Sequence, residues 1–463
     1  MRKKNNLTIK NIFDRQKPQL NGFEKNWDLK TRQRLLKKLE KSIRSHEEKL
    51  LEAVEKDLGR NTIQTYAAEI HPIYQEIKFT QKNLSSWMQA KSQPIPWLLR
   101  PSKAQSQYKP KGRILIVGPF NYPVSLLILP LIAAIASGNR VLLKPSERTQ
   151  ETSAILANVI EQAFQEDEVS LVEGGLEVMQ ELLALPFDHF FFTGSEKVGR
   201  IVYEKAAKHL ATVTLELGGK SPVIIWPKAS IKNAARKIVW GKFLNAGQTC
   251  VAPDYLLCHS SLRQDLVLKI IYEIKKQLAG TKPCCSEYYS KSISAENQKR
   301  WSNSLKGVKI IYGGEICQKC NKLGPTIVTD IPQIHPLNEE IFGPILPLYF
   351  MSELEEVYKK ISQHPYPLAT YVFSDNKKLN TKLKEEWQTG ALLNNEVMIH
   401  AGINLPFGGV KTSGIGRYRG YSGFKELSNI MTNIESSSLD FSQRYSPYRF
   451  NLEKTKKLLR WFF

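Results

Sequence analysis

The sequence predicts an α/β protein with two parallel-sheet domains and a small bridging element. Three observations support this fold class. The chain has 463 residues, which is more than one ordinary hydrophobic core accommodates. Its composition, 42% hydrophobic and 24% charged residues, is typical of globular proteins. Short β-rich runs alternate with helical stretches in two successive series, and such alternation predicts parallel sheets.

The N-terminal region is predicted to contain one long amphipathic helix. Apolar residues recur at helical spacing from Asp28 to Glu55. Pro94, Pro96 and Pro101 then interrupt the pattern. We therefore expect a connecting excursion near residues 94–112.

The first strand-helix series follows this excursion. Its strands are expected at Ile114–Val117, Val141–Leu143, Val169–Val172, His189–Phe192 and Val213–Leu215. Helices are expected around Leu126, Ala154, Met179 and Tyr203. The longest apolar stretch, Val124–Ala136, is too short for a membrane span, so it predicts a buried helix. Ligands bind at the carboxyl ends of such a sheet, so nucleotide binding is plausible here.

A second series begins after Gly218. It predicts strands at Val223–Ile225 and near Leu256, with helices through Ala234 and from Leu262 to Leu278. We accordingly divide the chain into residues 1–216, 217–400 and 401–463. The last part ends in Asn451–Phe463, where basic and apolar residues together predict a basic amphipathic helix.

The charge and cysteine content narrow the function classes. The net charge is +22, but lysine and arginine are spread along the whole chain, which favours a solvated basic surface. No nucleic-acid-binding motif accompanies the charge, so a nucleic-acid-binding protein remains only a rival hypothesis. Six cysteines in a chain of this length do not predict a disulfide framework. With no secretory signal recognised at the N-terminus, we expect a cytoplasmic location.

Two glycine motifs bear on nucleotide binding. Gly194 and Ser195, with Gly199 after them, lie where a strand passes into a helix, so backbone amides there can meet a pyrophosphate. The motif is not the G-x-G-x-x-G fingerprint. By itself it is as compatible with a structural turn as with a pyrophosphate-binding site. The second motif, Leu217–Ser221, ends like an ATPase phosphate-binding loop, but Thr214 stands where that loop requires glycine. An ATPase is therefore excluded.

One cysteine lies in a setting suited to nucleophilic catalysis. Cys250 ends the segment Asn245-Ala246-Gly247-Gln248-Thr249-Cys250, whose small residues allow close approach of backbone and substrate. A free cysteine is more often a small buried hydrophobic residue, so the surrounding motifs decide its interpretation.

These motifs together resemble the aldehyde dehydrogenase family. Glu216, in Thr214-Leu215-Glu216-Leu217-Gly218-Gly219-Lys220-Ser221-Pro222, and Cys250 thirty-four residues later match the catalytic pair of that family in order and spacing. The resemblance extends over nearly the whole chain, through segments 118–123, 144–147, 339–344 and 406–409. Cys250-Val251-Ala252-Pro253-Asp254-Tyr255 and Arg444-Tyr445-Ser446-Pro447-Tyr448 look like its class 3, fatty-aldehyde-like branch.

The resemblance implies an aldehyde dehydrogenase-like fold and a set of roles. Residues 1–216 would form a Rossmann-like NAD(P)-binding domain, 217–400 the catalytic domain, and 401–463 an oligomerisation or bridging segment with the tail. Cys250 would attack the aldehyde, Asn121 would stabilise the oxyanion, and Glu216 would activate the hydrolytic water. Tyr122 would line the aldehyde tunnel. The residues that would bind the cofactor are Lys144, Glu147, Gly194, Ser195, Gly199, Glu340 and Phe342.

The resemblance also implies substrates and partners. It suggests medium- or long-chain aliphatic and aromatic aldehydes, NAD with NADP as an alternative, and a homodimer. The competing hypotheses are a semialdehyde or phosphorylated-aldehyde dehydrogenase and a CoA-acylating relative. Docking on a partner subunit is favoured for the tail over peripheral membrane contact. Lys411 and Arg419 depart from residues common in relatives.

The remaining cysteines and the histidines give no catalytic prediction. Cys284, Cys285, Cys317 and Cys320 together offer four thiolates for zinc, but adjacent cysteines are poor tetrahedral ligands. The eight histidines show no ligand spacing. We therefore expect no metal site.

Overall fold

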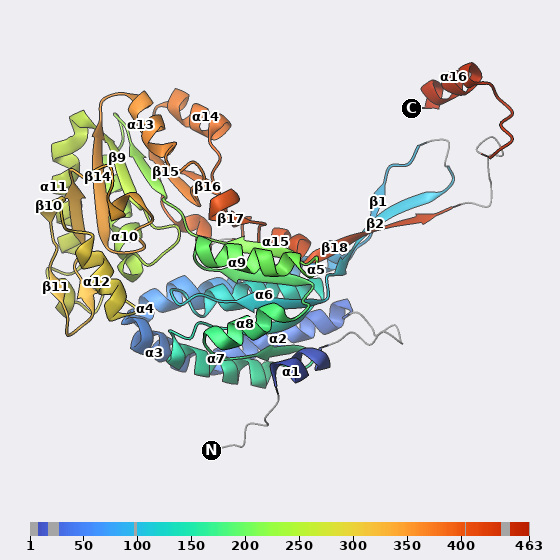
Figure 1. The fold of residues 1–463 in the computed structure, drawn as a ribbon, viewed down its shortest axis with the longest axis horizontal. Helices are drawn as coiled ribbons and strands as arrows, with labels where there is room; N and C mark the ends of the chain where they lie inside the picture. The colour runs from blue at the N-terminus through green and yellow to red at the C-terminus, as the bar shows by residue number, and fades with distance from the viewer. Residues whose placement is uncertain (1–7, 17–26, 97–99, 403, 437–444, 463) are drawn as a thin grey trace.

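The protein forms two lobes with a projecting arm (Figure 1). The structure is a computed structural model that describes residues 8–16, 27–96, 100–402, 404–436 and 445–462. Each lobe is built around its own sheet, and helices cover the sheets. No helix within these described ranges is both long and apolar enough to cross a membrane.

The first lobe contains a six-stranded sheet in the order β17-β7-β6-β3-β4-β5. Its parallel strands are β3 (Arg113–Val117), β4 (Arg140–Lys144), β5 (Val169–Leu171), β6 (His189–Thr193) and β7 (Thr212–Glu216). All five lie where the sequence predicts them. The edge strand β17 (Gly414–Ile415) runs antiparallel to β7 and comes from the C-terminal part of the chain.

Helices enclose this sheet. They are α6 (Ser125–Ser137), α7 (Gln150–Ala163), α8 (Leu176–Ala184) and α9 (Glu196–Ala207), as predicted. The predicted buried helix is α6, in which every residue except Leu126 is buried. The N-terminal helices pack outside it: α5 (His71–Met88) contacts α6, and α2 (Leu29–Ser45) contacts α7. The shorter segments are α1 (Ile9–Arg15), α4 (Thr62–Thr65) and the π-helical turn η1 (Tyr66–Ile70).

The prediction of a single long helix from Asp28 to Glu55 is wrong. The structure has two helices, α2 and α3 (Glu47–Leu58), which are separated at His46. His46 has φ −113° and ψ 6°, outside the helical range, so the hydrogen-bond ladder ends there. Both helices keep their apolar side facing the core. The apolar residues therefore recur at helical spacing on both sides of His46, and their spacing does not show that the helix is interrupted there.

The second lobe contains a seven-stranded sheet in the order β10-β13-β14-β9-β8-β15-β16. Its strands are β8 (Pro222–Ile225), β9 (Tyr255–His259), β10 (Lys309–Tyr312), β13 (Thr326–Thr329), β14 (Ile345–Met351), β15 (Ala369–Phe373) and β16 (Ala391–Asn394). All pairs are parallel except β10 with β13. The helices are α10 (Ile231–Phe243), α11 (Arg263–Gln277), α12 (Ala295–Asn303), α13 (Leu354–Ile361) and α14 (Lys377–Glu386). A second parallel-sheet domain is therefore confirmed.

The arm is a three-stranded antiparallel sheet that leaves the body to one side (Figure 1). Its strands are β1 (Lys91–Gln93), β2 (Lys103–Pro110) and β18 (Ser428–Glu435). The predicted excursion near 94–112 thus contributes β2, which pairs with β18 over its whole length. The helix α15 (Gly420–Glu426) leads into β18, and α16 (Leu452–Phe462) lies beyond the arm, away from both lobes.

Candidate active site

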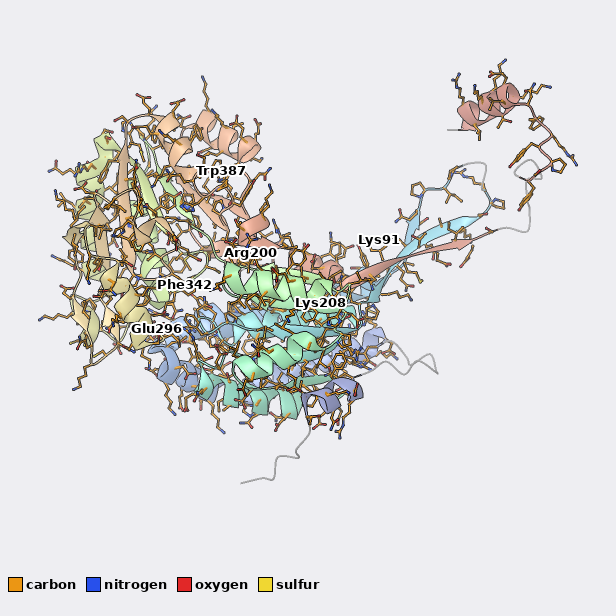
Figure 2. The ribbon with its side chains drawn as sticks, in the orientation of Figure 1. Lys91, Arg200, Lys208, Glu296, Phe342 and Trp387 are labelled. Carbon is orange, nitrogen blue, oxygen red and sulfur yellow. The ribbon has the colours of Figure 1, made fainter. Side chains whose placement is uncertain are left out.

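A cavity of about 520 Å³ lies where the two lobes meet. Both halves of the chain contribute to its walls, and Figure 2 shows Phe342 at this boundary. Nine of the residues predicted for the site line it: Asn121, Lys144, Glu147, Gly194, Ser195, Glu216, Cys250, Glu340 and Phe342. The fold thus brings together residues that are more than two hundred positions apart in the sequence.

Cys250 sits at the end of a strained loop. The short 3-10 turn Leu244–Gly247 precedes it, with Asn245 and Ala246 at φ 52° and 53°. Gly247 follows at φ +73°, and a Cβ there would collide with the carbonyl oxygen of Gly343. The small residues of this segment are therefore needed for the chain to turn tightly against the neighbouring loop.

The environment of Cys250 favours its neutral thiol. Burial, followed by the nearby carboxyls of Glu216 and Glu340, raises the pKa of Cys250 to about 12. The backbone amides of Cys250 and Val251 act in the opposite direction. Because only the thiolate is a good nucleophile, this thiol needs a base or a bound cationic group before it can attack.

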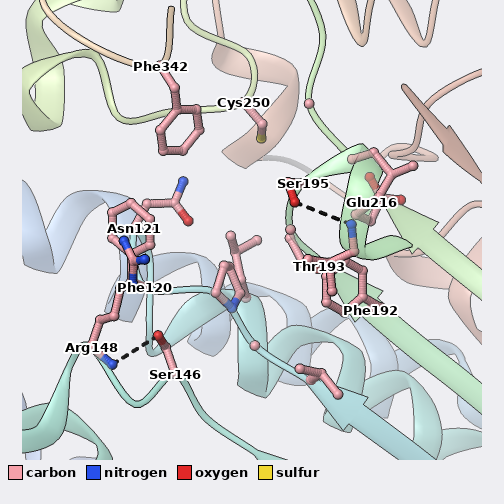
Figure 3. A pocket seen from close by; sticks show the side chains of 18 of the residues that line it. Phe120, Asn121, Ser146, Arg148, Phe192, Thr193, Ser195, Glu216, Cys250 and Phe342 are labelled. Carbon is pink, nitrogen blue, oxygen red and sulfur yellow. Dashed lines mark hydrogen bonds between the residues drawn. The ribbon is translucent and has the colours of Figure 1, made fainter. Parts of the chain in front are cut away.

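Asn121 points its amide into the same cavity (Figure 3). Its Nδ2 donates to the carbonyl oxygen of Gln248 at 3.0 Å, which holds the side chain against the cysteine loop. An amide nitrogen carries two hydrogens, so one donor remains for a ligand. The Asn121 carbonyl oxygen accepts hydrogen bonds from Arg60 at 2.9 Å and from Asn245 at 3.0 Å.

Glu216 is the last residue of β7 and reaches the cavity from the opposite wall (Figure 3). It is 3% exposed, and neither carboxylate oxygen has a hydrogen-bond partner in the described protein. Burial raises the pKa of Glu216 well above its usual value, although Arg417 and Arg419 oppose this shift. A buried carboxyl with two free oxygens and a raised pKa is suited to accept a proton from water.

The cofactor end of the cavity begins at the carboxyl end of β4. Lys144, the last residue of that strand, is 3% exposed, and its Nζ donates to Glu147 Oε2 at 2.7 Å. Glu147 is largely solvent-exposed, which leaves its second oxygen accessible. An ammonium beside a carboxylate in this position suits the hydroxyls of a ribose.

The N-terminus of α9 faces the same end of the cavity. Ser195 is the N-cap and accepts a hydrogen bond from the Val198 amide. The Gly194 amide donates to the Glu216 carbonyl oxygen at 3.0 Å, so it stabilises the strand end. The first-turn amides of the helix and its positive dipole end remain for an anionic group such as a pyrophosphate.

Glu340 and Phe342 form the wall contributed by the second lobe. Burial, then Asp254, raises the pKa of Glu340 to about 7, while the Gly219 amide, Lys220 and Arg300 act against this shift. A Cβ at Gly218 would collide with the Glu340 carboxylate, so the two loops depend on that glycine. The ring of Phe342 lies 5.9 Å from that of Phe120 across the cavity.

Two predicted site residues do not line this cavity. Gly199 lies within α9, where a Cβ would approach Leu217 Cδ2 to 2.6 Å, so glycine permits close packing against the chain after β7. Tyr122 is 8% exposed, and its hydroxyl hydrogen-bonds with Thr249 Oγ1 at 2.8 Å. Its role in an aldehyde tunnel stays a prediction.

The structure also adds residues that the sequence analysis missed. Asn297 and Arg300 reach the cavity from α12, and Arg300 donates to the Ile341 carbonyl oxygen at 2.9 Å. Arg148 and Phe120 line it from the first lobe. No motif marks α12, because its sequence reads as an ordinary polar helix that only the fold brings to the cavity.

Beneath the site lies a buried ion pair. Arg60 and Glu69 are both fully buried and form a charge-assisted hydrogen bond. Glu69 Oε2 also accepts the amides of Val124 and Ser125 at 2.8 and 3.0 Å, at the start of α6. This pair therefore connects the π-helical turn, the Asn121 backbone and the helix that follows it.

Replacing Glu69 with alanine is expected to destabilise the protein by about 3–5 kcal/mol, because Arg60 would stay buried without its counter-charge. The measurement is the change in unfolding free energy of the first lobe in urea. Glu40→Ala is the matched control, since it removes the exposed Arg44–Glu40 pair, worth under about 1 kcal/mol. Equal losses for the two variants would contradict this expectation.

The expectation of no metal site meets no contrary observation within the part of the chain that is described. There, no group of three or more His, Cys, Asp or Glu side chains is arranged to hold a metal ion. The side chain of Cys284 lies outside this description.

Comparisons of the sequence and the fold with known proteins identify the family. A family model described as "Aldehyde dehydrogenase family" matches residues 11–433. The chain is 39% identical over 427 residues to 4,4'-diaponeurosporen-aldehyde dehydrogenase of Staphylococcus aureus, covering 91% of this chain and 93% of the relative. It is 40% identical over 425 residues to mouse (Mus musculus) aldehyde dehydrogenase family 3 member A2, covering 90% and 87%. The substrate-bound state of Staphylococcus aureus AldH superimposes with a TM-score of 0.94 at 37% identity, covering 98% and 99%.

Proposed function

The chain belongs to the aldehyde dehydrogenase family and is an NAD(P)-dependent enzyme that oxidises aldehydes to carboxylic acids, and on this premise we propose how its residues share the reaction. The resemblance of the sequence to the class 3 branch agrees with its 40% identity to the mouse aldehyde dehydrogenase family 3 member A2. The observation that carries the proposal is the convergence of Cys250, Glu216 and Asn121 on one cavity.

Cys250 is the proposed nucleophile. Its thiol has a pKa of about 12, so it must lose a proton as it attacks the aldehyde carbon. The attack gives a tetrahedral thiohemiacetal with a negatively charged oxygen. The free hydrogen of the Asn121 amide and the Cys250 backbone amide are the proposed donors to that oxygen.

Glu216 is the proposed base for the second half of the reaction. The bound dinucleotide would supply the hydride acceptor, and loss of hydride from the thiohemiacetal would leave a thioester on Cys250. Glu216 then takes a proton from a water molecule that attacks this thioester. Its buried, unpartnered oxygens support the role, because no protein group competes for them among the described residues.

The cofactor is proposed to lie along the remaining wall. Lys144 and Glu147 would contact the adenosine ribose, the N-terminus of α9 the pyrophosphate, and Glu340 with Phe342 the nicotinamide riboside. Glu147 favours the free 2'-hydroxyl of NAD over a 2'-phosphate, while the adjacent Lys144 tolerates NADP.

The proposed substrates are medium- or long-chain aliphatic and aromatic aldehydes. The printed name of the Staphylococcus aureus relative points to a large apolar aldehyde for that protein. The test is NADH formation with hexanal, decanal and benzaldehyde, against succinic semialdehyde and a phosphorylated aldehyde. Faster turnover of either anionic substrate would contradict the proposed class, and product trapped by added CoA would favour a CoA-acylating enzyme.

A homodimer is also proposed. Apolar residues are exposed on the arm, where Ile430 and Ile434 of β18 are 66% and 57% exposed. Further apolar side chains are exposed on α9, where Ile201 is 43% exposed and Tyr203 51%. A second copy of the chain is the proposed partner that would cover these surfaces.

The tail offers a test of assembly. The helix α16 lies beyond the arm and away from the body, and its Leu452 and Leu459 are 68% and 41% exposed, so another molecule or a membrane is needed to cover them. Deleting residues 460–463 is expected to weaken the dimer, measured by analytical ultracentrifugation as a larger share of slowly sedimenting monomer at low protein concentration. Unchanged sedimentation would argue against subunit docking, and loss of liposome partitioning instead would favour the membrane alternative.

A further inference from the structure

Three cysteines lie near the β11–β12 hairpin of the second lobe, which the proposed reaction does not use, and two of them belong to the hairpin itself. Cys317 ends β11 (Ile316–Cys317), and Cys320 lies in the turn before β12 (Lys322–Leu323). Cys285 ends the short turn Pro283–Cys285, which packs against β12. Cys285 is exposed, and Cys317 and Cys320 are partly exposed. All three thiols are therefore near solvent.

The hairpin places two of these thiols in contact. Cys317 and Cys320 are three residues apart, and the Cys320 thiol hydrogen-bonds with the Cys317 side chain. The turn is tight, since the Asn321 amide donates to the Gln318 carbonyl oxygen at 3.2 Å. Cys317 pairs across the hairpin with Lys322, two positions after Cys320, so the chain turns back and brings the two cysteines close together. Little backbone movement is needed to join the two sulfurs.

The hairpin is held firmly on both sides. Gln298 of α12 donates to the carbonyl oxygens of Cys317 and Lys322, each at 2.9 Å. Lys322 Nζ donates to the Ser286 carbonyl oxygen at 3.1 Å, which ties β12 to the turn that carries Cys285. These contacts keep the thiols together, so the pair is preorganised and does not depend on chance encounters of a flexible loop.

A second thiol next to the first distinguishes this pair from Cys250. The hydrogen bond to Cys317 is the largest cause that raises the pKa of Cys320, so the two side chains lie next to each other. The ammonium of Lys322 lowers the pKa of Cys320 but does not reverse this shift. By contrast, burial raises the pKa of Cys250 to about 12. No second thiol lines the Cys250 cavity among the described residues, so a disulfide can form at the surface pair but not there.

We propose that Cys317 and Cys320 form a reversible disulfide site that a peroxide oxidises. The Cys317 thiolate attacks the peroxide oxygen, which gives a sulfenic acid and releases an alcohol or water. The Cys320 thiolate then attacks the sulfenic sulfur, so that an S–S bond forms and the oxygen leaves as water. Overall, two thiols lose two electrons and two protons while one O–O bond is reduced. The site is independent of the proposed roles of Cys250 and Glu216.

The test is peptide mapping of the full-length protein after graded hydrogen peroxide and alkylation of the remaining thiols. Trypsin cuts after Lys319, so a Cys317–Cys320 disulfide joins two peptides, 310–319 and 320–322, into one species that dithiothreitol separates. We expect this linked species to appear at a peroxide dose at which the Cys250 peptide is still fully alkylated. Oxidation of Cys250 while Cys317 and Cys320 remain reduced would overturn the proposal.

Two serine variants distinguish the pairing. Cys320→Ser is expected to remove the linked species, whereas Cys285→Ser is expected to leave its yield within about twofold of wild type. Loss of the linked species in Cys285→Ser would overturn the proposal. A disulfide from Cys285 to Cys317 or Cys320 in the wild-type protein would overturn it as well. Because mapping needs no turnover, failure here is separable from failure of the proposed aldehyde oxidation.

Discussion

Alanine in place of Cys250 is expected to abolish aldehyde-dependent NADH formation, with kcat/KM falling by more than ~10⁴-fold. The reason is chemical: the described cavity contains no other thiol to carry the acyl group. The measurement is steady-state NADH absorbance with decanal, together with intact mass spectrometry to look for acylated enzyme. NADH binding, followed by fluorescence, should persist, because the cofactor wall is unchanged.

Cys258→Ala is the matched control for this variant. Cys258 is a buried thiol in β9 that lies in the core and outside the cavity. Its replacement is expected to lower stability slightly while turnover stays close to wild type. Measurable turnover in Cys250→Ala, or equal inactivation of both variants, would rule out Cys250 as the nucleophile.

Glutamine in place of Glu216 is expected to stop the reaction after the first turnover. The amide keeps the shape of the carboxyl but cannot accept a proton, so the thioester should form and then persist. Rapid-quench kinetics should show a burst of NADH close to one equivalent, followed by a steady rate reduced ~10²–10⁴-fold. Mass spectrometry should find the acyl group on the peptide that contains Cys250.

Glu426→Gln is the matched control. Glu426 raises the pKa of Glu216 through space but does not line the cavity. Its replacement is expected to preserve hydrolysis. If Glu216→Gln lost the burst as well as the steady rate, Glu216 would be needed for acylation, and its assignment to the hydrolytic water alone would be wrong.

The pH dependence of the wild-type enzyme follows from the same carboxyl. A raised pKa means that Glu216 binds a proton at a higher pH than an ordinary glutamate, and the protonated form cannot act as base. Deacylation should therefore slow as the pH falls through that raised pKa. Glu340, with a pKa of about 7, titrates in the same cavity, so Glu340→Gln separates the two contributions.

The sequence alone predicted most of the local structure of the first lobe. Strands β3 to β7 and helices α6 to α9 appear where the patterns of apolar residues indicate them. These patterns succeed because a buried parallel strand and a packed helix leave distinct periodicities in the chain. The break at His46 was missed, since both flanking helices bury apolar residues at the same spacing.

The motif analysis located the chemical groups but not their full surroundings. Glu216 and Cys250 were identified from order and spacing, and both line the cavity. Gly199 belonged to the glycine motif of Gly194 and Ser195 yet serves the packing of α9, because a motif does not separate residues that contact a ligand from residues that let a helix approach. Asn297 and Arg300 carried no motif at all, although both line the cavity.

What the sequence by itself determined is the kind of chemistry: a thiol, a carboxyl and an amide, each in a short segment with its own turn residues. What only the tertiary structure decided is their environment. Burial, not sequence, raises the pKa of Cys250 and Glu216, and the fold brings Glu340 over Gly218 at the cavity. The physical reason is that desolvation and through-space charge depend on distances between segments, which no local pattern encodes.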